Sequence, residues 1–140
     1  MIRKFESRDL DKVMEIWLTT NIQAHNFISE EYWKNNFDMV KSMLPDADLL
    51  ISESEGNVNG FVGVDEGYIA GIFVSDEAQS KGIGKQLLDT IKERYLKLHL
   101  TVYKKNRKAV NFYQRELFVM KQEQMDKNTN EIEYLMEWEK

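Results

Sequence analysis

The chain has 140 residues, which fits one domain with a single hydrophobic core, so we expect residues 1–140 to form one domain. It contains no cysteine, which excludes a disulfide framework, a thiolate metal site and a cysteine nucleophile. The formal net charge of −5 argues against nucleic acid as the main partner, and no apolar run reaches the about 18 residues of a membrane-spanning helix. We expect a cytoplasmic protein without a nucleic-acid or membrane partner, as a monomer or a homodimer.

Hydrophobic periodicity and turn residues predict a mixed order of strands and helices along the chain. The expected elements are a strand at residues 2–6, a helix near Leu10 that Ser7 and Asp9 can cap, a helix from about Ser29 to Leu44, strands at 49–54 and 61–65 around a hairpin-type turn at 55–60, a strand at 68–74, a helix opened by residues 79–85, a strand at 97–103, a helix from Asn106, and strands around 118–125 and 131–138. This order predicts an α/β or α+β sheet flanked by helices.

The most informative stretch is Gln79-Ser80-Lys81-Gly82-Ile83-Gly84-Lys85, which follows an apolar strand pattern and opens an amphipathic helix. The N–H groups of a first helical turn have no intrahelical partner, and the helix dipole adds positive potential there. Glycines remove the Cβ atoms that would keep a phosphate away from those donors. The stretch therefore predicts a site for a phosphorylated ligand.

Two nucleotide-binding patterns are excluded for this loop. A P-loop needs glycine where Gln79 stands and a hydroxyl residue where Gln86 stands, and the dinucleotide fingerprint needs a third glycine at Leu87. The remaining pattern, Gln-x-x-Gly-x-Gly, resembles the pyrophosphate loop of the GNAT superfamily of acetyl-CoA-dependent N-acetyltransferases. Taken alone, the hexapeptide can also be an ordinary glycine-containing turn.

A second stretch strengthens the resemblance, which extends over essentially the whole chain. The alternating strand pattern at 98–103 is followed by Asn106, Ala109 and the pair Phe112-Tyr113, similar to the family's second cofactor motif. The family usually has glycine where Leu117 stands, which leaves the end of this helix open, because a left-handed residue is costly without glycine. The resemblance implies a mixed, mostly antiparallel central sheet with a splay between its central strands, flanked by helices.

The resemblance also implies acetyl-CoA as cosubstrate and direct transfer of its acetyl group to a primary amine. Tyr113 would be the general acid towards the departing sulfur, because a phenol is protonated at pH 7. The implied cofactor-binding residues are the strand backbone of Ile72, Phe73 and Val74, the loop residues Gln79, Lys81, Gly82, Ile83, Gly84 and Lys85, and Asn106. Gly71 would ease a bulge in the strand.

Structural roles compete with these assignments. Tyr113 can be a core aromatic residue, Asn106 a plain helix N-cap, and Lys81 and Lys85 solvated surface lysines.

The acceptor side carries weaker signals. The candidate acceptor-binding residues are His25, Phe27, Trp33 and Glu66. The general base is left open among Asp65, Glu66, Glu53, His25 and an ordered water. His99 alternates with two leucines and is expected to pack on the sheet, and two distant histidines without cysteine give no metal-site pattern. We expect no metal.

Several functions fit these observations. The acceptor is a small molecule or a protein lysine, and residues 24–28 with Tyr32 and Trp33 resemble a branch of the family that includes protein lysine acetyltransferases. A non-catalytic acyl-CoA-binding sensor or regulatory module is the alternative, and a structural domain with a vestigial loop is a third possibility. An intact Tyr113 favours the enzyme.

Overall fold

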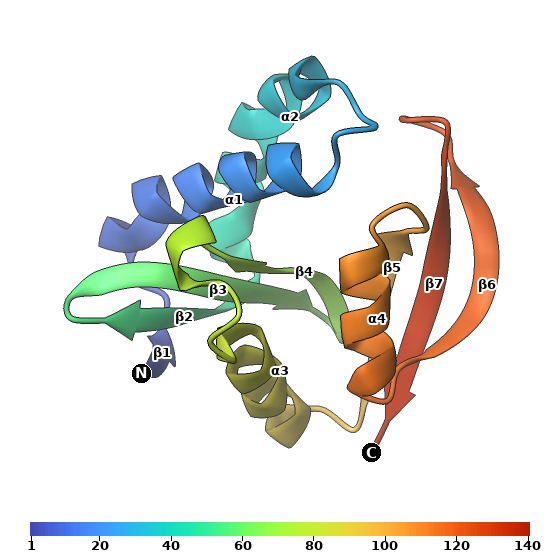
Figure 1. Ribbon diagram of the computed structural model, residues 1–140. Helices are drawn as coiled ribbons and strands as arrows, with labels where there is room; N and C mark the ends of the chain where they lie inside the picture. Colours follow the sequence, from blue (N-terminus) through green and yellow to red (C-terminus); the bar gives the residue numbers. More distant parts are fainter.

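The computed structural model describes residues 1–140 as one seven-stranded sheet with helices on both faces (Figure 1). The strands are β1 (Ile2–Lys4), β2 (Asp48–Ser54), β3 (Asn57–Asp65), β4 (Tyr68–Val74), β5 (Lys97–Tyr103), β6 (Val119–Asp126) and β7 (Glu131–Glu139), and the helices are α1 (Leu10–Ala24), α2 (Glu30–Met43), α3 (Ile83–Arg94) and α4 (Arg107–Arg115). The strand order is β1-β2-β3-β4-β5-β7-β6. None of the helices combines the length and the apolar character needed to cross a membrane.

A splay divides the sheet between β4 and β5, as the resemblance to the family implied. These two strands are the only parallel neighbours, and their ladder contains the single register pair Tyr68 and His99. Beyond that pair no further register pair joins the two strands, and Figure 1 shows β4 running towards α4 while β7 stands upright on the other side of that helix. The splay leaves an edge of β4 without a partner strand.

A bulge in β4 lies where the two strands begin to separate. The pairing with β3 shifts by one residue at Ala70, between the pairs of Ile69 and Gly71. A bulge bends a strand and increases its twist. Glycine at position 71 leaves room for the Phe73 ring, since a Cβ there would lie 2.4 Å from two of its carbons. The bulge was expected at Ile72 to Val74, just after Gly71, and the structure has it instead at Ala70, just before Gly71.

Two hydrophobic cores lie on opposite faces of the sheet. The first packs α3 and α4 against strands from both sides of the splay, with Leu87, Leu88 and Ile91 of α3 fully buried. The second packs α1 and α2 against β2, β3 and β4, with Val13, Met14 and Phe61 fully buried. Because the first core crosses the splay, it holds the two halves of the sheet together.

Three local expectations need correction. The β2–β3 turn contains only Glu55 and Gly56, both at positive φ (53° and 80°), the geometry of a two-residue type I′ hairpin, so β3 begins at Asn57 rather than near residue 61. Ser7 to Asp9 form a 3₁₀ turn. The Asp9 carboxylate accepts hydrogen bonds from the Glu6 N–H (2.8 Å) and from Arg3 (2.8 and 2.9 Å), so neither Ser7 nor Asp9 caps α1 by its side chain.

Helix α4 ends in a Schellman motif although it lacks the usual glycine. Leu117 takes the left-handed position with φ of 74°. The Phe118 N–H donates to the Tyr113 carbonyl (2.9 Å) and the Leu117 N–H to the Gln114 carbonyl (3.1 Å), and the Phe118 ring packs against Tyr113. The hydrogen bonds and the apolar contact therefore fix the end of the helix despite the strained leucine.

Candidate active site

A cavity of about 920 Å³ opens in the splay, between α1, β4, the β4–α3 loop, α3 and α4. Its volume lies within the roughly 300–1,000 Å³ range of small-molecule and cofactor sites. The residues singled out from the sequence that line it are Ile72, Phe73, Val74, Gln79, Gly82, Ile83, Gly84, Lys85, Asn106, Tyr113 and His25. Lys81, Phe27, Trp33 and Glu66 do not line it. The structure thus gathers three distant segments around one cavity.

The β4–α3 loop presents unpaired backbone donors at this cavity. Gly82 is the N-cap of α3 with φ of 80°, and no side chain caps the helix. The first intrahelical bond runs from the Gln86 N–H to the Gly82 carbonyl (3.0 Å), so the N–H groups of Ile83, Gly84 and Lys85 have no intrahelical partner. These donors and the helix dipole suit a pyrophosphate. The space beside Gly82 is open, because no atom of the protein lies within 4 Å of the place that a Cβ on this residue would take.

Two polar side chains of the loop are already engaged within the protein. The Gln79 amide donates from Nε2 to the Val74 carbonyl (3.1 Å) and accepts at Oε1 from Lys108 Nζ (3.4 Å). The Lys85 ammonium contacts Glu116 at 3.0 Å and Asp89 at 3.4 Å, and the hydrogen bond with Glu116 is the main cause that raises its pKa. Gln79 therefore connects the loop to β4 and α4. The charge of Lys85 is already paired, so its backbone N–H is the group that this residue presents to a ligand.

The free edge of β4 consists of Ile72 and Val74. In an antiparallel ladder the N–H and C=O of one residue point to the same side, and successive residues alternate. The Ser75 N–H donates to Asn59 of β3, so Phe73 also directs its backbone to β3, whereas Ile72 and Val74 direct theirs to the splay. The backbone groups of Phe73, which were expected to pair with the ligand, are thus already paired with β3, and the Phe73 ring stacks on Phe61.

Tyr113 lies on the α4 wall of the cavity with 7% of its surface exposed. Its ring packs between Phe112 and Phe118, which fixes its orientation. Burial, followed by the nearby Tyr68, raises the pKa of its hydroxyl well above the ordinary value. The Tyr68 hydroxyl itself lies 3.2 Å from Thr101 Oγ1, across the point where β4 and β5 separate. Tyr113 therefore carries its proton at pH 7.

A chain of hydrogen bonds joins α1 to the start of α4. Asn106 caps α4 by accepting from the Ala109 N–H (3.3 Å), and its amide donates to His25 Nε2 (3.2 Å). His25 Nδ1 in turn donates to the Asn21 carbonyl (3.1 Å). Burial lowers the pKa of His25, with the Asn21 bond acting in the opposite sense. His25 is thus neutral with both ring nitrogens engaged, which excludes it as a free general base in this arrangement.

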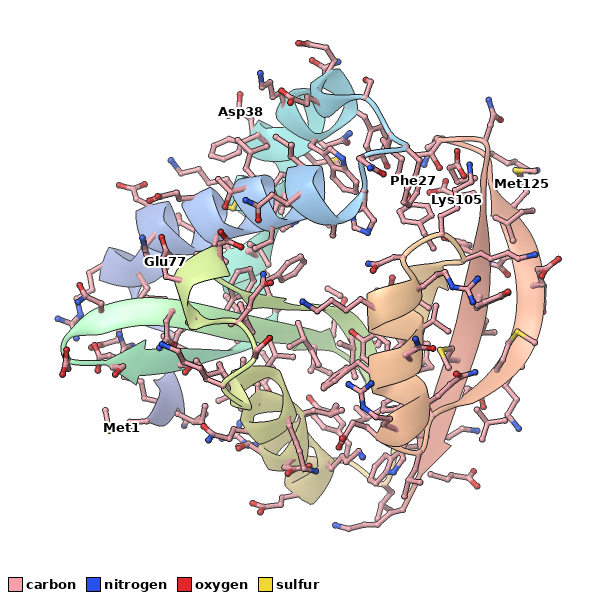
Figure 2. All side chains as sticks on the ribbon, viewed as in Figure 1. Met1, Phe27, Asp38, Glu77, Lys105 and Met125 are labelled. Atoms are coloured by element: carbon pink, nitrogen blue, oxygen red, sulfur yellow. The ribbon has the colours of Figure 1, made fainter.

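The aromatic acceptor candidates lie behind His25 rather than in the cavity. Trp33 stacks on the imidazole at 5.2 Å, and Phe27 and Tyr103 contact it edge-on. Figure 2 shows Phe27, in the α1–α2 loop, beside Lys105, whose ammonium lies 5.5 Å from the Phe27 ring centre. These rings support the position of His25.

The carboxylates considered as general bases do not reach the cavity. Glu66 lies with Asp65 at the β3–β4 turn, outside the cavity lining. Glu53 is hydrogen-bonded to Arg3 at the opposite edge of the sheet. The lining carboxylates are instead Asp76 and Glu116, the second of which is paired with Lys85.

The sequence reasoning missed the cations of α4 that line the cavity. Arg107, Lys108 and Arg115 all belong to its wall, as does Lys105 just before the helix. The signal was present in the segment Arg107–Arg115, which has three cations and no acidic residue in an acidic chain. The C-terminal end of α1, with Thr20 and Asn21, was missed as well, because its polar residues carry no motif.

Comparisons with known proteins agree with this geometry. The family model described as an acetyltransferase (GNAT) domain matches residues 18–137, which include every lining segment of the cavity. The peptidyl-lysine N-acetyltransferase YiaC of Escherichia coli K12 is 37% identical over 120 residues, 84% of this chain and 82% of YiaC. The peptidyl-lysine N-acetyltransferase YjaB of the same strain is 26% identical over 115 residues, 81% of this chain and 78% of YjaB. The solution structure of apo YjaB from Escherichia coli superposes with a TM-score of 0.86 at 23% identity, covering 99% of this chain and 96% of that chain.

Proposed function

Because this chain belongs to the GNAT family of acetyltransferases, we propose that it transfers the acetyl group of acetyl-CoA to the side-chain amine of a protein lysine. Transfer of an acetyl group to an amine follows from the family and from relatives that are themselves N-acetyltransferases. The observation that carries the choice of a protein lysine is the 37% identity to peptidyl-lysine N-acetyltransferase YiaC across 84% of the chain. These relatives and the position of Tyr113 favour an enzyme over a non-catalytic acyl-CoA-binding module.

The residues of the cavity fit acetyl-CoA. The unpaired N–H groups of Ile83, Gly84 and Lys85 would hold the pyrophosphate. The Ile72 N–H and C=O and the Val74 N–H would pair with the amides of the pantetheine arm, since the Val74 carbonyl already accepts from Gln79. Asn106 would place its side chain beside that arm while it caps α4. When bound, acetyl-CoA supplies an acetyl group activated as a thioester.

The reaction would then require two proton transfers, one to the departing sulfur and one from the attacking amine. Tyr113, protonated and held between two phenylalanine rings, would donate its proton to the departing sulfur. The attacking amine must lose a proton, and none of the carboxylates singled out from the sequence lines the cavity. We assign this proton to an ordered water in the cavity.

A thiol-release assay after calorimetry with acetyl-CoA tests this function. We expect binding of acetyl-CoA, followed by release of CoA only when a peptide with a free lysine amine is present. The control is the same peptide with its lysine already acetylated and its N-terminus blocked in both versions. Turnover of small amines alone, or of free N-termini alone, would contradict the lysine acceptor, and binding without any turnover would contradict the enzyme.

A further inference from the structure

The side chain of Asn106 is held by hydrogen bonds at both of its polar atoms. Its Oδ1 accepts from the Ala109 N–H (3.3 Å), which makes it the N-cap of α4, and its Nδ2 donates to His25 Nε2 (3.2 Å). An N-cap needs only the side-chain oxygen, and serine or aspartate supplies one equally well. The hydrogen bond to His25 is therefore more than the cap requires.

Backbone groups at both ends fix the direction of this hydrogen-bond chain. At one end the Asn21 carbonyl can only accept, so His25 carries its proton on Nδ1 and Nε2 is left as an acceptor. At the other end the Ala109 N–H can only donate, so the Asn106 amide presents its oxygen to α4 and its nitrogen to the imidazole. The tautomer of His25 and the orientation of the Asn106 amide thus depend on each other.

Aromatic rings hold the imidazole of His25 in place. Between ring centres, Trp33 stacks on it at 5.2 Å, while Tyr103 (5.2 Å) and Phe27 (5.7 Å) contact it edge-on. These rings come from α2, from the end of β5 and from the α1–α2 loop, so the imidazole cannot turn without disturbing three segments of the chain. Its Nε2 is therefore a fixed hydrogen-bond acceptor for Asn106.

Asn106 and His25 both line the cavity, and one donor of this pair is left for a ligand. An asparagine amide nitrogen carries two hydrogens, and His25 accepts one of them. The second hydrogen of Asn106 Nδ2 has no partner in the protein. Because His25 prevents the amide from turning over, Asn106 offers a ligand an N–H donor at this point. The amide carbonyls of a pantetheine arm are acceptors that match this donor.

We propose that His25 is a positioning residue for the cosubstrate, an inference that rests on the proposed function. It holds the Asn106 amide so that the remaining Nδ2 hydrogen donates to an amide carbonyl of the pantetheine arm. His25 acts only through Asn106 and takes part in neither proton transfer. Of its two ring nitrogens, Nε2 makes the contact that matters, whereas Nδ1 fixes the tautomer through the Asn21 carbonyl.

The variants His25→Gln and His25→Asn separate this role from simple packing. Both remove the aromatic contacts of the imidazole, but the amide of the first reaches the position of Nε2 and can accept from Asn106, whereas the amide of the second reaches only the position of Nδ1. Titration calorimetry with acetyl-CoA should find His25→Asn about three- to tenfold weaker than wild type, the range of one lost hydrogen bond, and His25→Gln closer to wild type. In an Asn106→Ala background the two substitutions should give equal affinities, because the residue through which they act is gone.

The tautomer of His25 can be measured without ligand or variant. Long-range ¹H–¹⁵N NMR spectra of the wild-type chain at about pH 7.5, above the ordinary pKa of histidine, should show the proton on Nδ1. A proton on Nε2 would overturn the inference even if a variant does not fold, and so would equal losses of affinity in His25→Gln and His25→Asn. Both outcomes leave the proposed function intact, whereas failure of the wild-type chain to bind acetyl-CoA would overturn both.

Discussion

At the scale of single residues, Tyr113 is the group on which the proposed chemistry depends most directly. Its ring is fixed by Phe112 and Phe118, and its raised pKa keeps the hydroxyl protonated. An acid that is never deprotonated in the ordinary pH range cannot produce an alkaline limb in the rate profile. Any alkaline limb must then come from another group.

We expect Tyr113→Phe to lower kcat by roughly 10²–10⁴, because the variant keeps the ring and loses only the proton donor. Affinity for acetyl-CoA and the melting temperature should stay close to wild type. Single-turnover measurements are needed beside steady-state rates, since slow product release can hide a loss in the chemical step. A variant within a factor of about two of wild type in single turnover would make Tyr113 a packing residue.

Leu117 stores strain that a single substitution can release. It is 72% exposed and holds the left-handed position of the Schellman motif at φ of 74°, so its side chain contributes little burial in return. Leu117→Gly should raise the free energy of unfolding by about 0.5–1 kcal/mol, since glycine adopts this conformation without a Cβ penalty. Denaturant unfolding measures the change. Leu117→Ala keeps the Cβ and should give no comparable gain; equal gains in both variants would refute the strain argument.

At the scale of elements, the loop before α3 is the proposed anchor of the cosubstrate. Gly82→Glu places a negative side chain beside the unpaired N–H groups, and we expect affinity for acetyl-CoA to fall about tenfold or more. The control is Gly82→Gln, which has nearly the same shape and the same backbone strain at φ of 80° but no charge. Calorimetry should find Gln between wild type and Glu. Unchanged affinity in a folded Glu variant would reject this loop as the pyrophosphate site.

The hydrogen-bonded link from α1 through His25 to α4 should make stability depend on pH. The folded-state pKa of His25 is lowered by burial, so the unfolded chain takes up a proton first as the pH falls below about 6.5. The stabilisation is complete above that pH and is lost as the pH falls through the folded-state pKa. Melting temperatures between about pH 7.5 and 5 should therefore fall further for wild type than for His25→Gln.

His99→Gln serves as the comparison for this prediction, because it removes the other histidine and leaves the link between His25 and Asn106 in place. It should retain the steeper pH dependence of wild type. Parallel melting curves for wild type and His25→Gln across this range would mean that His25 titrates in the same way in both states.

At the scale of the whole molecule, the splay converts a sheet into a binding site. Only one register pair joins the two halves of the sheet. The hydrophobic core that packs α3 and α4 against both halves holds them together on either side of the splay. The free edge of β4 is then available for an extended ligand instead of a neighbouring strand.

Hydrogen exchange by NMR can detect the ligand at this edge. We expect acetyl-CoA to slow the exchange of the Ile72 and Val74 amides, which point into the splay. The Phe73 amide is an internal control, because it faces β3 and should be protected with and without ligand. Equal changes at all three amides would indicate a general stiffening of β4, and no change at Ile72 and Val74 would exclude pairing along this edge.

Much of the fold and part of the site followed from the sequence because local patterns encode them. The bounds of β4 and β5 were predicted to the residue, from the continuous apolar run of β4 and the alternating pattern of β5. The N-cap role of Asn106 is confirmed, because it depends only on neighbouring backbone groups. The β2–β3 hairpin was predicted with too long a turn, because its pairing extends to Asn57 opposite Ser54 through a bulge that no periodicity reports.

By itself the sequence determined the elements, the glycine-bearing loop that opens α3 and the position of Tyr113 on the apolar face of α4. Only the tertiary structure decided which groups meet: Asn106 with His25, 81 residues away, and Lys108 with Gln79, 29 residues away. It also decided that the edge of β4 offers Ile72 and Val74 but not Phe73, and that Glu66 and Glu53 lie outside the cavity. The physical reason is that periodicity and capping report hydrogen bonds within an element and its apolar face, whereas the meeting of distant side chains depends on how the cores on both faces of the sheet orient the elements.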